Sequence, residues 1–200
     1  MKSLHRKILD AYVHDHRHYL KGKVLNVGGG SKTYRELANE MVVMDYYDKN
    51  PSGTQIHADV VADAQKEFPF PDELFDAVIC TQLLEHLPEP QFTVNQICRV
   101  LKPGGYLLLS VPFLERYHAD PDDYQRFTHR GIEWMLRDKF SIETIKPLGG
   151  RAVNIHYFLQ MHGVPEILLK AGEPVTRWLS GKEKNPQKWT VGFFSVAKKK

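Results

Sequence analysis

The sequence is short of cysteine, of excess charge and of long hydrophobic runs, and each shortage narrows the class of protein. Its 200 residues include two cysteines, Cys80 and Cys98, and both fall in apolar segments. We therefore expect buried thiols rather than a disulfide framework. The formal net charge of +3 is too small to indicate a nucleic-acid-binding protein. The one basic cluster, residues 198–200, is interpreted as a short solvated tail.

The N-terminal region has no apolar run long enough for a signal peptide or a membrane span. We therefore expect a cytoplasmic protein without a transmembrane segment. The sequence also has no internal repeats and no low-complexity segments. Its hydrophobic fraction of 42% and charged fraction of 26% are ordinary for a globular protein. A chain of this length predicts a single domain that buries about 70% of the surface of the unfolded chain.

The chain is organised around residues 75–112, which have the pattern of a strand, a helix and a second strand. The segments Ala77–Cys80 and Leu107–Val111 are almost continuously apolar. Such runs are typical of central strands in a parallel sheet that is buried on both faces. Two parallel strands joined through a helix form a βαβ unit, which is right-handed in nearly all proteins.

The helix of this unit is predicted from apolar residues at helical spacing, namely Val94, Ile97 and Leu101. Pro103 is predicted to end the helix, since proline cannot continue it. Gly104 and Gly105 follow and would allow the turn into the second strand.

Three phrases in this unit, FDAV, LLEHLPEP and RVLKPGG, occur in this order at close spacing. Together they resemble class I S-adenosylmethionine-dependent methyltransferases, in particular the broad group that includes the ubiquinone-biosynthesis type enzymes. The resemblance covers roughly residues 23–148. It implies an α/β fold with a Rossmann-like doubly wound sheet, mostly parallel with an antiparallel last strand. It also implies S-adenosyl-L-methionine as cofactor and a small-molecule substrate.

The whole chain, 1–200, is predicted to be one methyltransferase domain with a helical insert before the last strand. Its parts are an N-terminal helix (1–22), a cofactor-binding core (23–148), a helical insert (149–188), and the last strand with the basic tail (189–200). The last strand is predicted from the alternation of Trp189, Val191 and Phe193. The apolar face of the insert would serve as a substrate lid, a homodimer surface or a membrane-surface contact.

A glycine run, Gly28 to Gly30, follows the first predicted strand, where open α/β sheets bind ligands. A dinucleotide fingerprint would need glycine at Thr33, and a phosphate-binding P-loop would need lysine at Ser31. A methyltransferase cofactor loop tolerates this sequence best, although Asn26 and Lys32 depart from the family's usual pattern.

The resemblance implies a cofactor site that comprises Asn26, Gly28, Gly30, Asp45, Tyr46, Asp63, Ala64 and Gln82. Asp45, at the tip of the second strand, would accept hydrogen bonds from the ribose hydroxyls, with Tyr46 along the adenosine. Asp63 would accept from the adenine amine, and Asp59 is the alternative for this role. Gln82 would contact the methionine part of the cofactor.

The loop at 113–128 contains an unusual density of polar residues after a predicted strand. Its pattern H-x-D-P-x-D-Y-x-R-F-T resembles a subgroup often associated with glycan or cell-surface polysaccharide synthesis. His118 is the candidate general base, by its ordinary pKa and its loop position. The candidate substrate-binding residues are His86, Asp123, Tyr124 and Arg126. Alternatively, Arg126 braces the loop through Asp122 or Asp123, His86 orients the next helix, and Thr128 caps the helix after the loop.

No metal site is predicted. His14, His16 and His18 alternate, and alternate residues point to different faces of a helix. The predicted function is methyl transfer to a small molecule, such as a hydroxyl of a sugar or glycan precursor. Two alternatives stay open: an inactive cofactor-binding or regulatory protein with the same fold, and a nucleotide-binding enzyme of another type.

Overall fold

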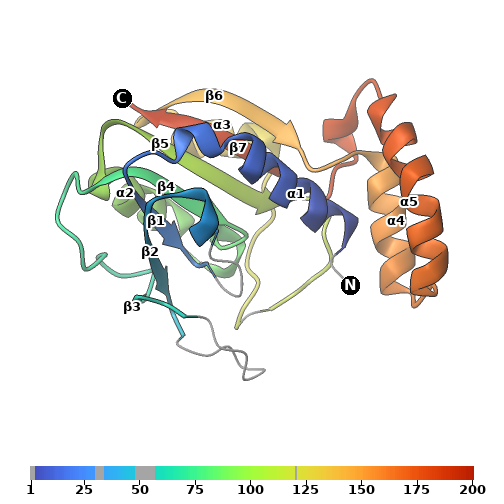
Figure 1. Cartoon of the computed structure of the whole chain (residues 1–200), viewed down its shortest axis with the longest axis horizontal. Coiled ribbons are helices and arrows are strands. Elements are labelled where there is room, and N and C mark those ends of the chain that lie inside the picture. Colours follow the sequence, from blue (N-terminus) through green and yellow to red (C-terminus); the bar gives the residue numbers. More distant parts are fainter. Residues whose placement is uncertain (1–2, 30–33, 48–56, 120) are drawn as a thin grey trace.

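The computed structural model describes residues 3–29, 34–47, 57–119 and 121–200, and it contains one seven-stranded sheet with helices on both faces (Figure 1). The strands are β1 Lys23–Val27, β2 Glu40–Asp45, β3 Val60–Val61, β4 Phe75–Thr81, β5 Leu101–Pro112, β6 Phe140–Pro147 and β7 Gly192–Lys199. The α-helices are α1 Leu4–Asp15, α2 Pro90–Val100, α3 His129–Leu136, α4 Arg151–Met161 and α5 Glu166–Gly181.

The strand order across the sheet is β3-β2-β1-β4-β5-β7-β6. The strands from β3 to β5 pair in parallel, and β7 is antiparallel to both of its neighbours, β5 and β6. This arrangement confirms the predicted doubly wound sheet with an antiparallel last strand. The chain runs outward in opposite directions from the β1–β4 pair, so the carboxyl ends of these two strands form the topological switch point where such sheets bind ligands.

Successive side chains of the central strands enter two different cores, one on each face of the sheet. In β1, Leu25 packs into the core covered by α2 and α3, whereas Val24 packs into the core covered by α1. In β4, Val78 and Ile79 divide in the same way. Both faces are therefore dry, which explains why these strands are nearly continuous apolar runs in the sequence. Cys80 and Cys98 are both buried free thiols, as predicted.

The turn predicted after the first crossover helix is wrong in its boundaries. α2 ends at Val100, and Leu101 is already extended and pairs with Phe75 of β4. Pro103 and the two glycines lie within β5, where the pairing shifts register between Phe75 and Ala77. The physical reason is that proline disfavours helical geometry in the residues before it, so the helix ends earlier than its apolar spacing indicates.

The last strand also differs from its prediction. It begins at Gly192 rather than Trp189, and residues 192–197 are all buried instead of alternating, because β7 lies between two strands with both faces covered. Lys198 and Lys199 continue this strand, and Lys199 Nζ donates to the Leu101 carbonyl at 2.6 Å. Lys198 and Lys199 therefore belong to the sheet rather than to a tail, although Lys198 and Lys200 are exposed as expected.

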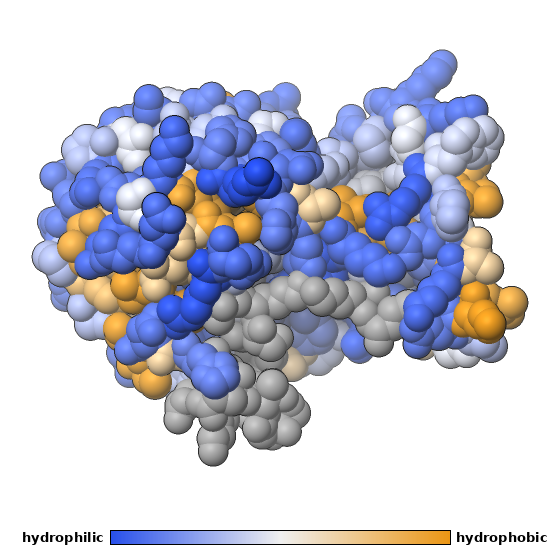
Figure 2. Space-filling model, in the orientation of Figure 1, coloured by the Kyte–Doolittle hydropathy of each residue, from blue (hydrophilic) through white to orange (hydrophobic). Residues whose placement is uncertain are grey.

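The predicted helical insert consists of α4 and α5, which lie side by side at one end of the sheet (Figure 1). A small core of Leu4, Val153, Tyr157 and Val191 joins α4 to α1. Apolar surface is visible on this helix pair (Figure 2). The exposed apolar side chains of α4 and α5 include Phe158, Leu159, Ile167, Leu168, Val175, Trp178 and Leu179. Among the described residues, no helix combines the length and apolar character needed to cross a membrane. The homodimer or membrane-surface role of the insert stays a prediction.

Candidate active site

A cavity of about 430 Å³ opens at the carboxyl ends of β1, β2 and β4. Its wall includes residues of the predicted cofactor site and also His86, Asp122 and Arg6. The lining residues include Arg6, Gly28, Gly29, Asp45, Tyr46, Asp63, Ala64, Thr81, Gln82, Leu83, His86, Pro121 and Asp122. Arg6 was not predicted, because α1 lies far from the glycine loop in sequence.

Gly28 turns the chain away from β1 at the floor of this cavity. Its φ is +66°, and a Cβ at this position would lie 2.8 Å from Leu83 Cδ1, so glycine is required both for conformation and for space. Asn26 is fully buried beneath the loop and does not line the cavity. It supports the loop rather than facing a ligand. Gly30 and Lys32 lie outside the described residues.

Asp45 stands at the carboxyl end of β2, beside Gly28, whose N–H donates to the Met44 carbonyl at 2.9 Å. The Asp45 side chain is mostly buried, and it lines the cavity together with Tyr46, which is half exposed. A carboxylate at this edge can accept hydrogen bonds from vicinal hydroxyls such as those of a ribose. The predicted role of Asp45 is consistent with this position.

Asp63 and Asp59 are now separated by their surroundings. Asp63 and Ala64 line the cavity. Asp59 does not line it, because its Oδ2 accepts hydrogen bonds from Arg35 Nη2 and from the Val43 N–H, both at 2.8 Å. Asp59 therefore fixes the entry of the third strand. Asp63 lines the cavity, where its Oδ1 accepts the Gln65 N–H at 2.9 Å and its Oδ2 lies 3.7 Å from Lys66 Nζ. Contact of Asp63 with a cofactor stays a prediction.

Gln82 lines the cavity at the end of β4 and adopts a positive φ of 52°. Its N–H donates to the Ser110 carbonyl at 2.9 Å, and its side-chain amide donates to Ser110 Oγ at 3.2 Å. These two bonds tie the end of β4 to β5. Contact with the methionine part of a cofactor stays a prediction for this side chain.

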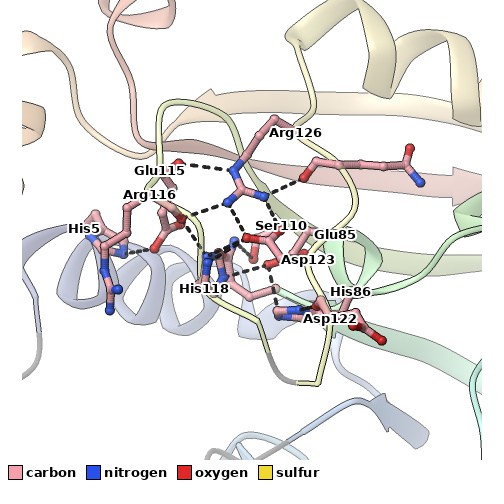
Figure 3. Close-up of polar contacts among 12 residues, drawn as sticks. His5, Glu85, His86, Ser110, Glu115, Arg116, His118, Asp122, Asp123 and Arg126 are labelled. Carbon is pink, nitrogen blue, oxygen red and sulfur yellow. Dashed lines mark hydrogen bonds and ion pairs between the residues drawn. The ribbon is translucent and has the colours of Figure 1, made fainter.

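His86 and the loop that follows β5 form another part of the cavity wall. The Asp122 carbonyl accepts a hydrogen bond from His86 Nδ1 at 2.6 Å, so the ring nitrogen that remains, Nε2, is directed toward Glu85 (Figure 3). His86 therefore lines the cavity and holds the loop in place at the same time. This bond holds the loop after β5 rather than the next helix, so it differs from the predicted structural role, and substrate binding by His86 stays a prediction.

His118 lies beside Glu85 and His86, and not on the cavity wall itself (Figure 3). Its Nε2 is 3.7 Å from Glu85 Oε1, and this carboxylate is the main cause that raises the pKa of His118 to about 9. A ring with this pKa is about 99% protonated at pH 7. At neutral pH His118 is therefore a cation in the absence of other ligands, which disfavours the predicted role of general base.

Arg126 braces the loop. Its guanidinium donates to the Asp123 carboxylate and to the carbonyls of Glu115, Arg116 and Gln125. These bonds use all five N–H groups of the guanidinium and leave none for a substrate. The geometry favours the bracing alternative over the predicted substrate-binding role.

Asp123 and Tyr124 complete the loop. The Asp123 side chain is 1% exposed, and the Arg126 guanidinium lowers its pKa to about 2. Its Oδ2 also accepts the His118 N–H at 2.7 Å, so it positions His118. Tyr124 is exposed, and its N–H donates to the Glu85 carbonyl at 2.8 Å. Substrate binding by Asp123 and Tyr124 stays a prediction. As predicted, Thr128 Oγ1 caps α3 by accepting the Gly131 N–H.

Comparison with known proteins identifies this architecture. Residues 25–109 match the family model of a methyltransferase domain. A ubiquinone biosynthesis O-methyltransferase from Xylella fastidiosa (strain 9a5c) is 34% identical over 84 residues, which are 41% of this chain and 33% of that relative. The chain therefore spans only a third of the length of that relative.

Two solved structures share the fold over nearly the whole chain. A SAM-dependent methyltransferase from Archaeoglobus fulgidus superimposes with a TM-score of 0.64 at 18% identity, covering 98% of this chain and 94% of that chain. The Burkholderia thailandensis 1,6-didemethyltoxoflavin-N1-methyltransferase, with bound 1,6-didemethyltoxoflavin and S-adenosylhomocysteine, gives 0.61 at 15% identity, covering 98% and 78%. The chain contains a class I S-adenosylmethionine-dependent methyltransferase fold, which confirms the resemblance seen in the sequence.

Proposed function

We propose that this protein transfers a methyl group from S-adenosyl-L-methionine to a hydroxyl group of a small molecule. The observation that carries the proposal is one cavity whose wall brings together the glycine turn, two carboxylates, His86 and Asp122. The family match supports the cofactor, and the name of the Xylella relative, an O-methyltransferase, supports an oxygen acceptor. Fold alone would not suffice, because one fold supports many chemistries.

The cavity wall offers residues suited to each part of this cofactor. Asp63 and Ala64 would hold the adenine, and Asp45 would accept from the ribose hydroxyls. Gly28 would allow close approach of the amino-acid end. When bound, the cofactor supplies an electrophilic methyl group. The chain's own task is then to align an acceptor oxygen with that group and to exclude water, and alignment supplies much of the rate.

The acceptor would enter from the part of the cavity lined by His86, Asp122 and Arg6. A sugar or glycan-precursor hydroxyl is the finer proposal, and it is supported by the resemblance of the 118–128 loop alone. The name of the Xylella relative suggests a ring hydroxyl as the competing acceptor. Both are small hydroxyl compounds, so a single screen with labelled cofactor over sugars, glycolipid precursors and quinols distinguishes them.

Cofactor binding is tested by calorimetry with a matched pair of variants. Asp63→Asn is expected to weaken S-adenosylmethionine binding by about 1–3 kcal/mol, because a charge-assisted hydrogen bond to the adenine is lost. Asp59→Asn is the control, since its carboxylate is engaged with Arg35 away from the cavity. Equal effects of the two substitutions would remove Asp63 from the site. Tight cofactor binding without transfer to any acceptor would favour the inactive alternative.

A further inference from the structure

Glu85, His86 and His118 form a cluster beside the cavity, and of the three only His86 lines it. One ligand atom from each residue lies within 4.8 Å of the other two. Glu85 Oε1 is 3.9 Å from His86 Nε2 and 3.7 Å from His118 Nε2. Ligands about 2 Å from a tetrahedral zinc ion lie about 3.3 Å apart, so small side-chain movements would close the cluster around one ion.

Both histidines have their other nitrogen fixed by the backbone. His86 Nδ1 lies 2.6 Å from the Asp122 carbonyl, and His118 Nδ1 lies 3.0 Å from the Arg116 carbonyl. A carbonyl can only accept, so each Nδ1 carries the proton and each Nε2 is the ligand atom. A ring held through its second N–H to a backbone carbonyl is the usual second-shell pattern of a metal-binding histidine.

Glu85 adds a second observation, because its neighbours His86 and His118 lie 3.9 and 3.7 Å from its Oε1, beyond ordinary hydrogen-bond distance. Its side chain is fully buried, and neither carboxylate oxygen accepts a hydrogen bond from any residue that the structure describes. Burying a carboxylate without hydrogen bonds is costly, and a coordinated cation removes that cost. His86 lines the cavity, so an ion held here would face a ligand in it.

We propose that Glu85, His86 and His118 bind one divalent transition-metal ion, with Zn²⁺ the best match to two imidazoles and a carboxylate, and that an open coordination position receives the acceptor hydroxyl. Three protein ligands and one open position are the arrangement of catalytic zinc sites. The sequence predicted no metal site, because the three ligands lie on two segments that only the fold brings together. The role toward the acceptor rests on the methyl-transfer function proposed above, whereas ion binding does not.

The chemistry would be Lewis-acid activation of the acceptor. Coordination lowers the pKa of the hydroxyl, and its proton leaves to water. The acceptor oxygen then forms a bond to the methyl carbon, and the bond from that carbon to the sulfonium breaks with its electron pair going to sulfur. The step needs no oxidant or reductant. It also needs no side chain as general base.

Ion binding is tested on the full chain after treatment with EDTA and dialysis. Titration with Zn²⁺ by calorimetry is expected to give one site per chain, and bound Co²⁺ is expected to show visible absorption that reports nitrogen ligands. Glu85→Gln, which keeps the side-chain size, and His118→Asn are each expected to weaken Zn²⁺ binding at least tenfold. Circular dichroism checks that both variants are folded.

The matched control is His14→Ala. His14 Nε2 lies 3.8 Å from Glu36 Oε1, a similar pair, but it is exposed and belongs to no three-residue cluster among the described residues. This variant should bind Zn²⁺ like the wild type. Absence of saturable binding, or equal binding by the wild type and Glu85→Gln, would overturn the proposal and leave Glu85 and His118 as an ion pair.

The two proposals fail in different ways. Ion binding is measured without cofactor or acceptor, so a failed methyl-transfer screen would not affect it. If methyl transfer is found, EDTA should abolish it and Zn²⁺ should restore it. Transfer that is unchanged after EDTA, in a protein shown to be free of metal, would refute the role of the ion while leaving the methyltransferase function intact.

Discussion

Removal of the Arg126 guanidinium should destabilise the whole protein rather than weaken substrate binding alone. Arg126→Ala deletes a bidentate pair with Asp123, whose carboxylate is 1% exposed, and three further bonds to backbone carbonyls. Breaking a buried ion pair from one side costs about 3–5 kcal/mol, because it leaves a buried charge. The Arg126 side chain is 25% exposed, so we expect a loss of about 2–4 kcal/mol.

The assay is urea unfolding followed by circular dichroism, with the free energy of unfolding compared between variants. Arg126→Lys keeps the charge but not the planar fork, so it should recover less than half of the loss. The double variant Arg126→Met, Asp123→Leu removes both charges and should be more stable than Arg126→Ala. An Arg126→Ala protein within 0.5 kcal/mol of the wild type, with a raised Michaelis constant, would refute the bracing role and restore the substrate-binding prediction.

Three further outcomes follow from single positions. Gly28→Ala should lower the free energy of unfolding by about 2–3 kcal/mol, because Gly28 has both a positive φ and Leu83 close by. Gly163 also has a positive φ but open space around it, so Gly163→Ala should lower the free energy of unfolding by only about 1 kcal/mol. Thermal unfolding compares the two variants. Thr128→Ala should cost about 1 kcal/mol through loss of the α3 cap, measured in the same way. Lys102 lowers the pKa of Asp76 below its ordinary value, so this carboxylate stabilises the fold above about pH 4, and the stabilisation is lost as the pH falls. The free energy of unfolding, measured against pH, should therefore decline less steeply on the acid side in Asp76→Asn than in the wild type. An unchanged decline would contradict this role of Asp76.

The sheet could be predicted from the sequence because its central strands are buried on both faces and therefore read as unbroken apolar runs. Element ends were less predictable. An alternating pattern predicts that β7 starts at Trp189. The strand starts at Gly192, and because it has a neighbour on both edges and no face open to solvent, its residues do not alternate. The apolar spacing predicts that the helix before β5 includes Leu101. In the structure Leu101 is instead extended and pairs with Phe75 of β4.

For the cavity, too, residues placed by the strand topology could be predicted, and residues placed by packing could not. The positions of Asp45 and Asp63 at the cavity could be predicted, because Asp45 ends β2 and Asp63 comes two residues after β3, so the topology places both at the carboxyl edge of the sheet. Arg6 could not, because helix packing across the sheet decides which residue of α1 reaches the opening. The contact between Glu85 and His118 could not be predicted either. The two residues are far apart in the sequence, and the loop that carries His118 could place its side chains in many ways. The acid beside His86 in LLEH was the only local signal.

In the loop after β5, some polar residues stabilise the loop and position others that are proposed to act in the site. Asp123 accepts from Arg126 and from the His118 N–H, so the same carboxylate that stabilises the loop also fixes the backbone that presents His118 to Glu85. A change at Arg126 should therefore alter the position of His118 without touching it. The two effects can be separated, because a loss of stability reports the brace and a loss of Zn²⁺ affinity in the still-folded Arg126→Lys protein reports the position of His118. Unchanged Zn²⁺ affinity in a destabilised Arg126→Lys protein would show that the brace serves the fold alone and that Asp123 positions His118 without help.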